Sequence, residues 1–586
     1  MRNAKIVCTL GPASDDRDTI RELATAGMSV ARLNASHGTT DHRETVIERV
    51  RDVDDALDDP LAVMVDLKGP EVRTAETDEP ARLATGSEVT FVAGDDATPD
   101  RIGLTHTISA ATPGDTVLLD DGRIECRVER VTDDGAVVTT VVSGGKLGSR
   151  KGVNLPGVAI DVDLVTPADE AELRLAARAD ADFVAASFVR DGDDVYRIAD
   201  LLEEYGGDDI PVIAKIERAG AVENLEGIVE AADGVMVARG DLGVECPLED
   251  VPMIQKRIIR TCVNAGVPVI TATEMLDSMI RSRRPTRAEA SDVANAVLDG
   301  TDAVMLSGET AIGDHPARVV ETMDRIVREV ETSEEYAETR EQRVPTAAEG
   351  SRTEALARSA RYLARDIDAS TVVAVSESGF TARKTAMFRP GVPVVATTPD
   401  DRVRRQLALS WGVQPVTTEY ASDMESVLDN AVDAAIDTGA AASGDTLVVL
   451  SGMLTELEGT NTTNTLKVHV AAETLVTGKA VVAGRAAGPV HRVADGDLGP
   501  VPDGAIVALA EGFDAEFEGD LDRIAGIVDA RPGMTGYPAV IARELGVPMI
   551  SGATLPGTVA EGDVITVDGE RGVVYDGDVV TPGRRR

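Results

Sequence analysis

The chain has 586 residues, too many for one hydrophobic core, and at ~100–200 residues per domain we expect about three to five domains. Its 102 acidic residues outnumber its 58 basic ones to give a net charge of −44, which argues against a nucleic-acid partner because the phosphates would be repelled. The sequence contains no run of ~18 apolar residues, so we expect no membrane span. The first residues lead directly into a predicted strand, so we expect no signal peptide.

Short apolar runs separated by amphipathic stretches dominate the first part of the chain, and this pattern predicts strand–helix units. Eight such units over ~250 residues favour an α/β fold with a (β/α)8 TIM barrel, formed by residues 1–69 and 166–345. Polar residues follow the runs, at the end of the barrel where such folds carry their sites. The runs are 5–10, 29–34, 61–67, 182–188, 211–217, 234–240, 268–274 and 302–308.

Charged residues end two of these runs in a way that predicts chemistry. Lys215 and Glu217 close the run PVIAKIE two residues apart, and in a strand that spacing points both side chains to the same side. Asp241 follows the next run, GVMVARG. Buried charges at strand ends are costly unless they meet a ligand or a metal, so we expect an electrophilic, metal-assisted active site here.

Four further segments follow in or after these barrel units. Residues 70–165 show alternating strands joined by Asp-Gly and Gly-Gly turns, which predicts an inserted β-barrel lid domain able to swing over the TIM barrel. The acidic segment 331–350 predicts a linker helix and a domain boundary. Residues 350–472 again alternate helix and strand, which favours a separate α/β domain, and the Gly- and Val-rich residues 476–586 form a fourth unit.

The use of cysteine, histidine and charged residues indicates the compartment and the salt concentration in which the protein works. The four cysteines are scattered and lack a C-x-x-C spacing, which is typical of reduced thiols in a cytoplasmic protein. The six histidines are also scattered, so we expect no histidine-based zinc site. The acidic excess is typical of a soluble surface, and its extent favours adaptation to high salt, where screening removes the repulsion.

Motifs spread over residues 3 to about 470 resemble the pyruvate kinase family. They are KIVCTLGPAS, ARLNASHG, DLKGPEVRT, KGVNLPG, KIE, MVARGDLGVE, RPTRAEASDVANAVLDG and MLSGET, and their number and order make the resemblance specific. With its acidic composition the chain looks like a pyruvate kinase of a halophilic archaeon. Residues 476–586 resemble the swivelling phosphohistidine domain of phosphoenolpyruvate-utilising enzymes, an extension that some bacterial pyruvate kinases carry.

The resemblance implies transfer of a phosphoryl group from phosphoenolpyruvate to ADP, giving pyruvate and ATP in the last step of glycolysis. A loose phosphoryl-transfer transition state needs mainly alignment and positive charge. By resemblance, Lys215 stabilises the developing enolate charge and Arg32 grips the phosphoryl group. Thr273 assists protonation of the enolate, and the amides of Gly240 and Asp241 hold the substrate carboxylate at a helix start.

The resemblance also implies two cations. Glu217 and Asp241 match the ligands of Mg²⁺ or Mn²⁺, and two carboxylates plus substrate oxygens suit such an ion. An all-oxygen K⁺ site is implied at four positions, namely Asn34, Ser36, Asp66 and the carbonyl of Leu67.

By resemblance, the nucleotide is bound by the stretch Asn34, Ala35, Ser36 and His37, and by Arg73 and Lys151 near the lid hinges. His37 could equally be a polar residue at a strand end, and Arg73 and Lys151 could be solvated surface charges. The chain departs from the family pattern at three places without losing a required group: Ala35 stands where Phe is usual, Leu67 where Thr is common, and Glu274 where Gln is common.

The extension lacks its usual reactive group. In PGMTGYPAVIARELGVP, Gly536 and Tyr537 occupy the place of the Ser-His pair of phosphohistidine domains. Tyrosine cannot replace a phosphohistidine, so we expect a structural or regulatory domain.

Two other functions stay open at this point, together with partners that only the resemblance suggests. A phosphotransferase that works through phosphohistidine would need the missing histidine and an ATP-grasp region, which is not found. A non-catalytic metabolite sensor would be favoured by loss of Lys215, Asp241 or Thr273, and all three are present. The loop 376–384 resembles the binding region for a phosphorylated allosteric effector, and the family suggests a homotetramer.

Overall fold

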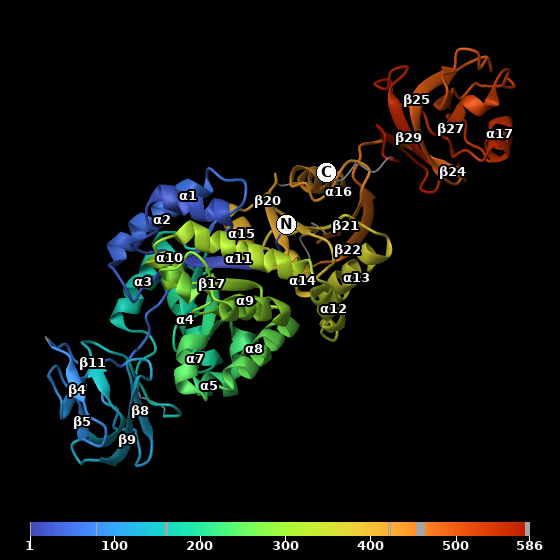
Figure 1. Ribbon diagram of the computed structural model, residues 1–586. Coiled ribbons are helices and arrows are strands. Elements are labelled where there is room, and N and C mark those ends of the chain that lie inside the picture. Colours follow the sequence, from blue (N-terminus) through green and yellow to red (C-terminus); the bar gives the residue numbers. More distant parts are fainter. Residues whose placement is uncertain are drawn as a thin grey trace. The chain divides into compact units, whose positions relative to one another are not determined.

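The structure is a computed structural model that describes residues 2–77, 79–158, 162–419, 421, 423–452 and 463–580. The chain divides into two compact units (Figure 1). The first comprises Met1–Ala355, Ser376–Arg389 and Thr398–Thr417, and the second comprises Leu356–Val375, Pro390–Thr397 and Thr418–Arg586. No helix in the described part of the chain is long and apolar enough to span a membrane.

Within the first unit, eight described strands close a parallel barrel, in the order β1-β17-β16-β15-β14-β13-β3-β2. Cys8 of β1, for example, pairs with Ala31 on one side and with Leu306 on the other. All eight predicted runs form these strands, which confirms the (β/α)8 barrel. The strands are β1 (Lys5–Thr9), β2 (Val30–Asn34), β3 (Ala62–Asp66), β13 (Phe183–Ala186), β14 (Val212–Ile216), β15 (Gly234–Ala238), β16 (Val269–Ala272) and β17 (Ala303–Leu306).

Helices follow the strands, and local signals set their ends. Asp16 caps the first helix by accepting hydrogen bonds from the amides of Asp18 and Thr19, while Thr166 and Thr286 each form a capping box. The helices are α1 (Arg17–Ala26), α2 (Thr40–Asp54), α3 (Pro167–Arg178), α4 (Gly192–Glu204), α5 (Ala219–Glu223), α6 (Leu225–Ala231), α7 (Arg239–Glu245), α8 (Val251–Ala265), the 3-10 helix η1 (Asp277–Ile280), α9 (Arg287–Asp299), α10 (Gly308–Ala311), α11 (Pro316–Glu331) and α12 (Glu334–Gln342).

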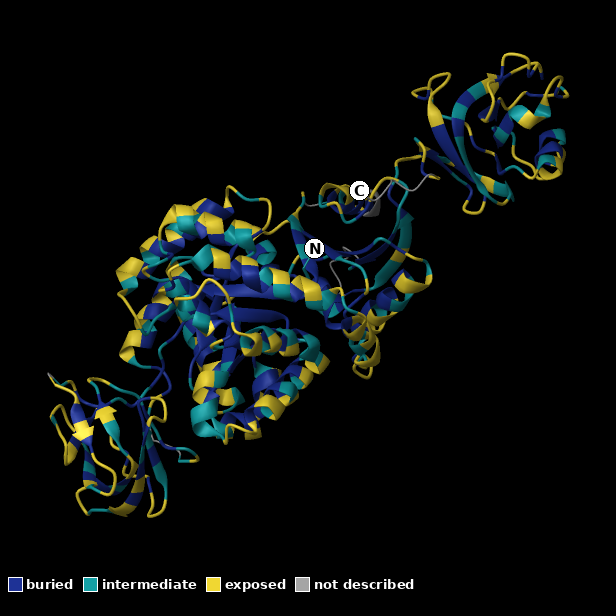
Figure 2. Ribbon diagram, in the orientation of Figure 1, coloured by how far each residue is buried: buried dark blue, intermediate teal, exposed yellow. Residues whose placement is uncertain are grey.

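Alternating strand residues build two apolar layers. Val7, Met64 and Ile213 belong to one buried cluster, whereas Ile6 and Cys8 belong to the larger cluster that includes the helix side chains. This alternation is the two-residue period of a strand, with one set inside the barrel and the other beneath the helices. Figure 2 shows the resulting buried strands and the exposed outer faces of the helices.

The insertion between β3 and α3 is entirely β in its described residues. A seven-stranded sheet has the order β12-β8-β9-β10-β5-β7-β6, and β11 pairs with β4 in a two-stranded sheet. A core of its own includes Phe91, Ile102 and Val117, all fully buried. The strands are β4 (Ala81–Leu83), β5 (Glu88–Ala93), β6 (Ala97–Thr98), β7 (Arg101–Leu104), β8 (Thr116–Leu119), β9 (Ile124–Val131), β10 (Val137–Ser143), β11 (Gly145–Leu147) and β12 (Val153–Asn154).

The segment 331–350, expected to be a linker, contains α12 and is packed on the first unit. Tyr336 of α12 is 6% exposed, and its hydroxyl accepts a hydrogen bond from Trp411 Nε1 at 3.0 Å. The first unit also holds α14 (Phe380–Met387), α15 (Asp401–Gln406), the 3-10 helix η2 (Leu407–Leu409) and β20 (Val413–Thr417). Leu409 of η2 joins the cluster inside the barrel.

The second unit contains two further sheets. In one, β18 (Thr371–Val375) pairs in parallel with β19 (Val394–Thr398) and β21 (Thr446–Ser451), and β22 (Thr465–Val470) is antiparallel to β21, which confirms an additional α/β region. Helices α13 (Arg352–Asp366) and α16 (Met424–Asp437) belong to this region.

The last residues form an eight-stranded sheet of described strands with one α-helix, in the order β23-β30-β29-β25-β26-β27-β28-β24. Ile506, Ile565 and Val567 are among its fully buried core residues. The elements are β23 (Thr474–Thr477), β24 (Lys479–Val482), β25 (Arg485–Val493), β26 (Ala505–Leu509), the 3-10 helix η3 (Leu521–Arg523), β27 (Ile524–Asp529), α17 (Tyr537–Leu545), β28 (Met549–Ser551), β29 (Val564–Asp568) and β30 (Val573–Asp576).

Candidate active site

The carboxyl ends of β3, β13 and β14 bring one ammonium group into contact with two carboxylates and a hydroxyl. Lys215 Nζ donates to Ser187 Oγ at 2.7 Å and forms ion pairs with Glu217 Oε1 at 2.8 Å and with Asp66 Oδ1 at 3.3 Å. The side chains of Lys215 and Glu217 are 11% and 2% exposed, and that of Asp66 is fully buried. Lys215 and Glu217, two of the charges predicted at the strand ends, therefore lie in one cluster with Asp66.

Arg32, from the middle of β2, belongs to the same cluster. Its Nε lies 2.6 Å from Asp66 Oδ2, and its Nη1 donates to Thr9 Oγ1 at 2.8 Å. The Asp66 carboxylate thus lies between two cations, Arg32 and Lys215. This arrangement fixes two positive groups at the same end of the barrel, as the phosphoryl-transfer prediction requires.

The electrostatics keep this cluster charged. Burial raises the pKa of Asp66, but the positive charges of Arg32 and Lys215 outweigh burial and hold the pKa below its ordinary value. Burial lowers the pKa of Lys215, but the charges of Asp66 and Glu217 outweigh it and the pKa is raised. A permanent ammonium therefore stands at a site largely closed to water.

Glu217 and Asp241, the predicted ligands of a divalent ion, are two carboxylates that have one cation, Lys215, near both of them. Burial raises the pKa of Glu217, and the charge of Asp241 adds to the rise. The pKa of Asp241 is raised by loss of solvation of its carboxylate and by the charges of Glu71 and Asp121, although the residue as a whole is exposed. A cation bound between these carboxylates would relieve that cost. Among the described residues no three His, Cys, Asp or Glu side chains are grouped so that they could hold a metal ion.

The residues predicted to bind K⁺ gather around Asp66 and offer oxygen atoms. Asp66 Oδ1 is buried and makes no hydrogen bond to any described residue, and Asn34 Oδ1 accepts from the amide of Ser36 at 3.0 Å. The carbonyl of Leu67 accepts from Ser187 Oγ at 2.7 Å. Because β2 ends at Asn34, the extended alternation does not reach Ser36, which lies in a turn. These oxygen donors fit a hard monovalent ion.

Thr273 lies just beyond β16, in an unfavourable backbone conformation that hydrogen bonds from Arg239 stabilise. Thr273 and Glu274 have φ values of 79° and 53°, in the left-handed region that β-branched and bulky residues rarely adopt. Arg239 braces the turn, because its Nη2 donates to the Thr273 carbonyl at 2.8 Å and its Nε to the Ala272 carbonyl at 3.0 Å. A Cβ on Gly240 would lie 2.8 Å from Thr273 Cγ2, so glycine is required for this close approach.

Asp241 and Gly240 stand in the first turn of α7, where amide groups have no partner within the helix. The same turn begins directly after β15, so those amides face the end of the barrel at which Thr273 and Lys215 lie. The predicted carboxylate-binding groups and the predicted proton-handling threonine are therefore neighbours.

The predicted nucleotide residues fall into two places. Arg73 and Gly152 form a β-bridge, so Arg73 and Lys151 lie on adjacent segments at the base of the insertion. Lys151 Nζ pairs with Asp120 Oδ1 at 2.7 Å, and Arg73 Nη2 pairs with Glu71 Oε2 at 2.6 Å.

Ala35 and His37 follow the end of β2, and neither side chain makes a contact that assigns it a role. The Ala35 amide donates to the Asp66 carbonyl at 2.9 Å, which joins this stretch to the cation cluster. His37 is exposed, and its carbonyl accepts from Arg43 Nη1 at 2.6 Å.

Sequence reasoning missed two residues of this site. Ser187 bonds to Lys215 from just beyond the end of β13, and a polar residue next to last in the run DFVAASF was the signal for it. Arg239 stood in a quoted motif, but its bonds to the backbone of the Thr273 turn depend on two strand ends meeting in space.

The start of α17 in the C-terminal region is built differently. Tyr537 is the first residue of this helix, and its hydroxyl accepts a hydrogen bond from the Phe517 amide at 3.1 Å. The Tyr537 ring lies 5.7 Å from that of Phe517, which lies 5.6 Å from that of Phe513. The phenol is thus part of an aromatic cluster that anchors the helix.

Comparisons with known proteins agree with the geometry. The family described as "Pyruvate kinase, barrel domain" matches residues 1–320, "Pyruvate kinase, alpha/beta domain" matches residues 354–469, and "PEP-utilising enzyme, mobile domain" matches residues 501–572. A pyruvate kinase of Geobacillus stearothermophilus is 41% identical over 584 residues, and one of Bacillus licheniformis is 40% identical over 586 residues; each match covers 98% of this chain and 99% of the relative. A pyruvate kinase of Staphylococcus epidermidis is 39% identical over 585 residues, with the same coverage. The chain therefore belongs to the pyruvate kinase family and functions as a phosphotransferase of that family.

Proposed function

We propose that this chain transfers the phosphoryl group of phosphoenolpyruvate to ADP, giving pyruvate and ATP, at the carboxyl ends of the barrel strands. The single observation that carries this proposal is the position of Lys215 Nζ, within 3.3 Å of Ser187, Asp66 and Glu217. Its raised pKa keeps it an ammonium, so it stabilises negative charge on the enolate rather than acting as a base.

Arg32 supplies the second fixed cation. Its guanidinium is oriented by Asp66 and Thr9, which leaves the phosphoryl oxygens as partners for its remaining N–H groups. Substrate binding replaces water by these preorganised charges, so little reorganisation is needed when the phosphoryl group moves.

Two cations complete the site in this proposal. Glu217 and Asp241 hold Mg²⁺ or Mn²⁺, and Asn34, Ser36, Asp66 and the Leu67 carbonyl hold K⁺. When bound, the divalent ion neutralises phosphoryl and carboxylate charge and the monovalent ion adds positive potential. Asp66 Oδ1, which is buried and has an ion pair with Lys215 Nζ but no other partner among the described residues, supports the monovalent-ion site. The raised pKa values of Glu217 and Asp241 support the divalent-ion site.

Thr273 handles protonation of the enolate, directly or through water, from a turn that Arg239 holds in place. The amides of Gly240 and Asp241 bind the substrate carboxylate. On the nucleotide side, Asn34 to His37, Arg73 and Lys151 contact ADP, and closure of the insertion would change the ion pairs that Arg73 and Lys151 now make.

Other features remain proposals that rest on sequence and family. We propose four domains with the boundaries 1–69 with 166–345, 70–165, 350–472 and 476–586. The enzyme is cytoplasmic and assembles as a homotetramer, and the loop 376–384 contributes to binding of a phosphorylated effector.

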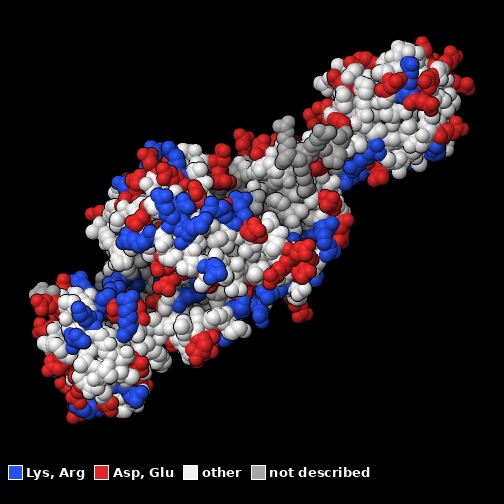
Figure 3. Space-filling view, viewed as in Figure 1, with Lys and Arg blue, Asp and Glu red and all other residues white. Residues whose placement is uncertain are grey.

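The acidic surface is an adaptation to high salt in this proposal. Figure 3 shows acidic side chains spread over the viewed face of each unit, with Lys and Arg among them. The excess of 102 acidic over 58 basic residues supports it.

A coupled assay tests the proposed reaction. The full chain is given phosphoenolpyruvate, ADP, Mg²⁺ and molar KCl, and pyruvate is detected through a coupling enzyme. We expect turnover that needs both substrates and both ions. Substrate binding without turnover would favour a metabolite sensor, and ATP-dependent formation of phosphoenolpyruvate through a phosphoenzyme would favour the phosphohistidine route.

A further inference from the structure

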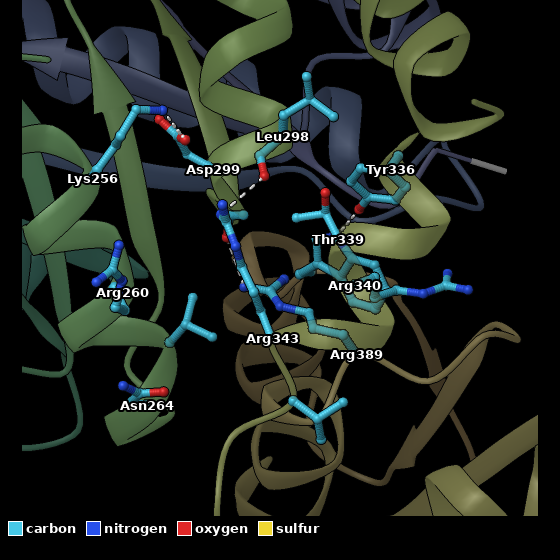
Figure 4. Close-up of a pocket in the computed structure, with 14 residues that line it drawn as sticks. Lys256, Arg260, Asn264, Leu298, Asp299, Tyr336, Thr339, Arg340, Arg343 and Arg389 are labelled. Atoms are coloured by element: carbon cyan, nitrogen blue, oxygen red, sulfur yellow. Dashed lines mark hydrogen bonds and ion pairs between the residues drawn. The ribbon is translucent and has the colours of Figure 1, made fainter. Parts of the chain in front are cut away.

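A cavity lies in the first unit, apart from the strand-end residues described above. Its volume is about 310 Å³, and residues of α8, α9 and α12 line it together with the segments that contain Arg389 and Trp411. Figure 4 shows the side chains of α8, including Arg260 and Asn264, on one side and those of α12 on the other. That volume is near the lower end of the range of ~300–1,000 Å³ for small-ligand sites.

The cavity is basic although the chain is acidic. Five cationic side chains line it against one carboxylate, Asp299, in a chain of net charge −44. Lys256 pairs with Asp299, but no hydrogen bond or ion pair joins the exposed Arg260 to another described residue. A concentration of arginine around a pocket matches the fork geometry and charge of a phosphate group. The five cations are Lys256, Arg260, Arg340, Arg343 and Arg389.

Apolar side chains form the rest of the lining. They include Val263, Leu298 and Val344, with Tyr336 and Trp411 between them. Inorganic phosphate would leave this apolar surface uncovered, whereas an organic phosphate would bury it. The lining therefore fits a ligand with a phosphate at one end and an apolar or planar part at the other.

Hydrogen bonds connect this cavity to the turn that carries Thr273. Asp299, which pairs with Lys256 at the cavity wall, accepts from Gln255 Nε2 at 3.2 Å. Gln255 Oε1 in turn accepts from Arg239 Nη1 at 3.4 Å, and Arg239 holds the Thr273 carbonyl at 2.8 Å. A phosphate that draws Lys256 away from Asp299 changes the first link of this chain.

We propose that the cavity is a regulatory site for a small organic phosphate, and that Asp299, Gln255 and Arg239 couple it to Thr273. Binding at the cavity is independent of the catalytic roles given above, whereas the coupling rests on the proposed role of Thr273. The two parts are therefore measured separately.

Trp411 is the single tryptophan of the chain, so its fluorescence reports on this cavity directly. The full chain, in the KCl concentration that keeps it folded, is titrated with inorganic phosphate, ribose 5-phosphate and a 5′-nucleoside monophosphate. We expect a saturable change with at least one organic phosphate at concentrations where inorganic phosphate gives none. Arg260→Ala should weaken that binding about tenfold or more, because a hydrogen bond between charged groups is lost.

Arg257→Ala is the matched control on the same helix, since Arg257 is exposed, pairs with Glu226 and does not line the cavity. It should bind the organic phosphate as the wild type does. No fluorescence change with either organic phosphate, equal binding of inorganic phosphate, or equal affinity in the Arg260→Ala and wild-type proteins would each overturn the site.

The coupling is tested with Gln255→Ala. In the wild type, the bound organic phosphate should change the KM for phosphoenolpyruvate more than kcat. In Gln255→Ala, the Trp411 titration should persist while the ratio of KM values with and without the ligand falls to about one. A variant that binds the ligand and keeps the full KM shift would refute the coupling through Gln255. A protein with no turnover but a saturable Trp411 titration would contradict the proposed function and leave the site standing.

Discussion

Two regions of this chain resemble phosphoryl-handling domains, and they differ in what they retain. At the barrel end, Lys215, Glu217 and Asp66 remain as buried, mutually paired charges, which is costly unless a ligand or ion uses them. At the start of α17, the reactive position holds Tyr537, whose ring and hydroxyl are both used in packing. The barrel end thus keeps the buried charged groups that its chemistry needs, whereas the C-terminal region keeps its fold with a tyrosine at the position that would be reactive.

The largest effect is expected from Lys215→Met. This change removes the ammonium opposite the transferring charge, and loss of one such group typically lowers kcat by about 10²–10³-fold, with a larger loss for a unique cation. Lys479→Met is the control, since Lys479 is exposed on β24 of the other region and should leave kcat unchanged. Circular dichroism checks that both variants fold. More than about a tenth of wild-type kcat in Lys215→Met would rule out the assigned role.

Replacement of K⁺ by tetramethylammonium at constant ionic strength should remove most of the activity. Asn34, Ser36 and Asp66 offer oxygens for a small monovalent ion, and the bulky cation cannot enter. Glu71 contributes negative charge near Asp241, and family resemblance places a lysine at this position in K⁺-independent relatives. Glu71→Lys should therefore reduce the K⁺ requirement. Full wild-type activity without K⁺ would be incompatible with the proposed ion site.

Lower salt should destabilise both regions. The Debye length grows from ~3 Å at 1 M to ~30 Å at 0.01 M, so many more like charges then repel one another. That repulsion opposes a free energy of unfolding of only ~5–15 kcal/mol per domain. Thermal melts from 0.1 M to 2 M NaCl and KCl measure the effect, and we expect the melting temperature to rise with either salt. An unchanged melting temperature would show that the acidic excess serves another purpose.

The smallest effect on chemistry is expected from truncation after Thr477, which removes most of the C-terminal region. Donor and acceptor meet within the barrel site, so no phosphate carrier is needed and turnover should remain. Stability, assembly or effector response can change, because the removed strands bury a core of their own. A truncated protein that folds yet has no turnover would assign this region a part in the reaction.

The sequence predicted the fold better than the contacts within the site. Runs such as PVIAKIE placed every barrel strand, because a strand buried on both faces is read directly from its apolar residues. Lys215, Glu217 and Asp241 followed from charges at the strand ends. The bond between Ser187 and Lys215 did not follow, since it depends on how far two neighbouring strand ends approach. Ser36 does not lie on a strand, because β2 ends at Asn34 and the chain turns.

Transfer of labelled phosphate in a single turnover tests the central claim most directly. Enzyme in excess is mixed with ³²P-labelled phosphoenolpyruvate and ADP, and the reaction is quenched in alkali at short times. The label is then followed in ATP and in protein. Intact mass analysis of each region shows where any protein-bound phosphate lies. We predict that label passes into ATP with no protein-bound phosphate, because the neutral phenol of a tyrosine such as Tyr537 is a poor nucleophile toward phosphoenolpyruvate, unlike imidazole. An acid-labile phosphate on residues 476–586 that forms first and then decays into ATP would contradict the account.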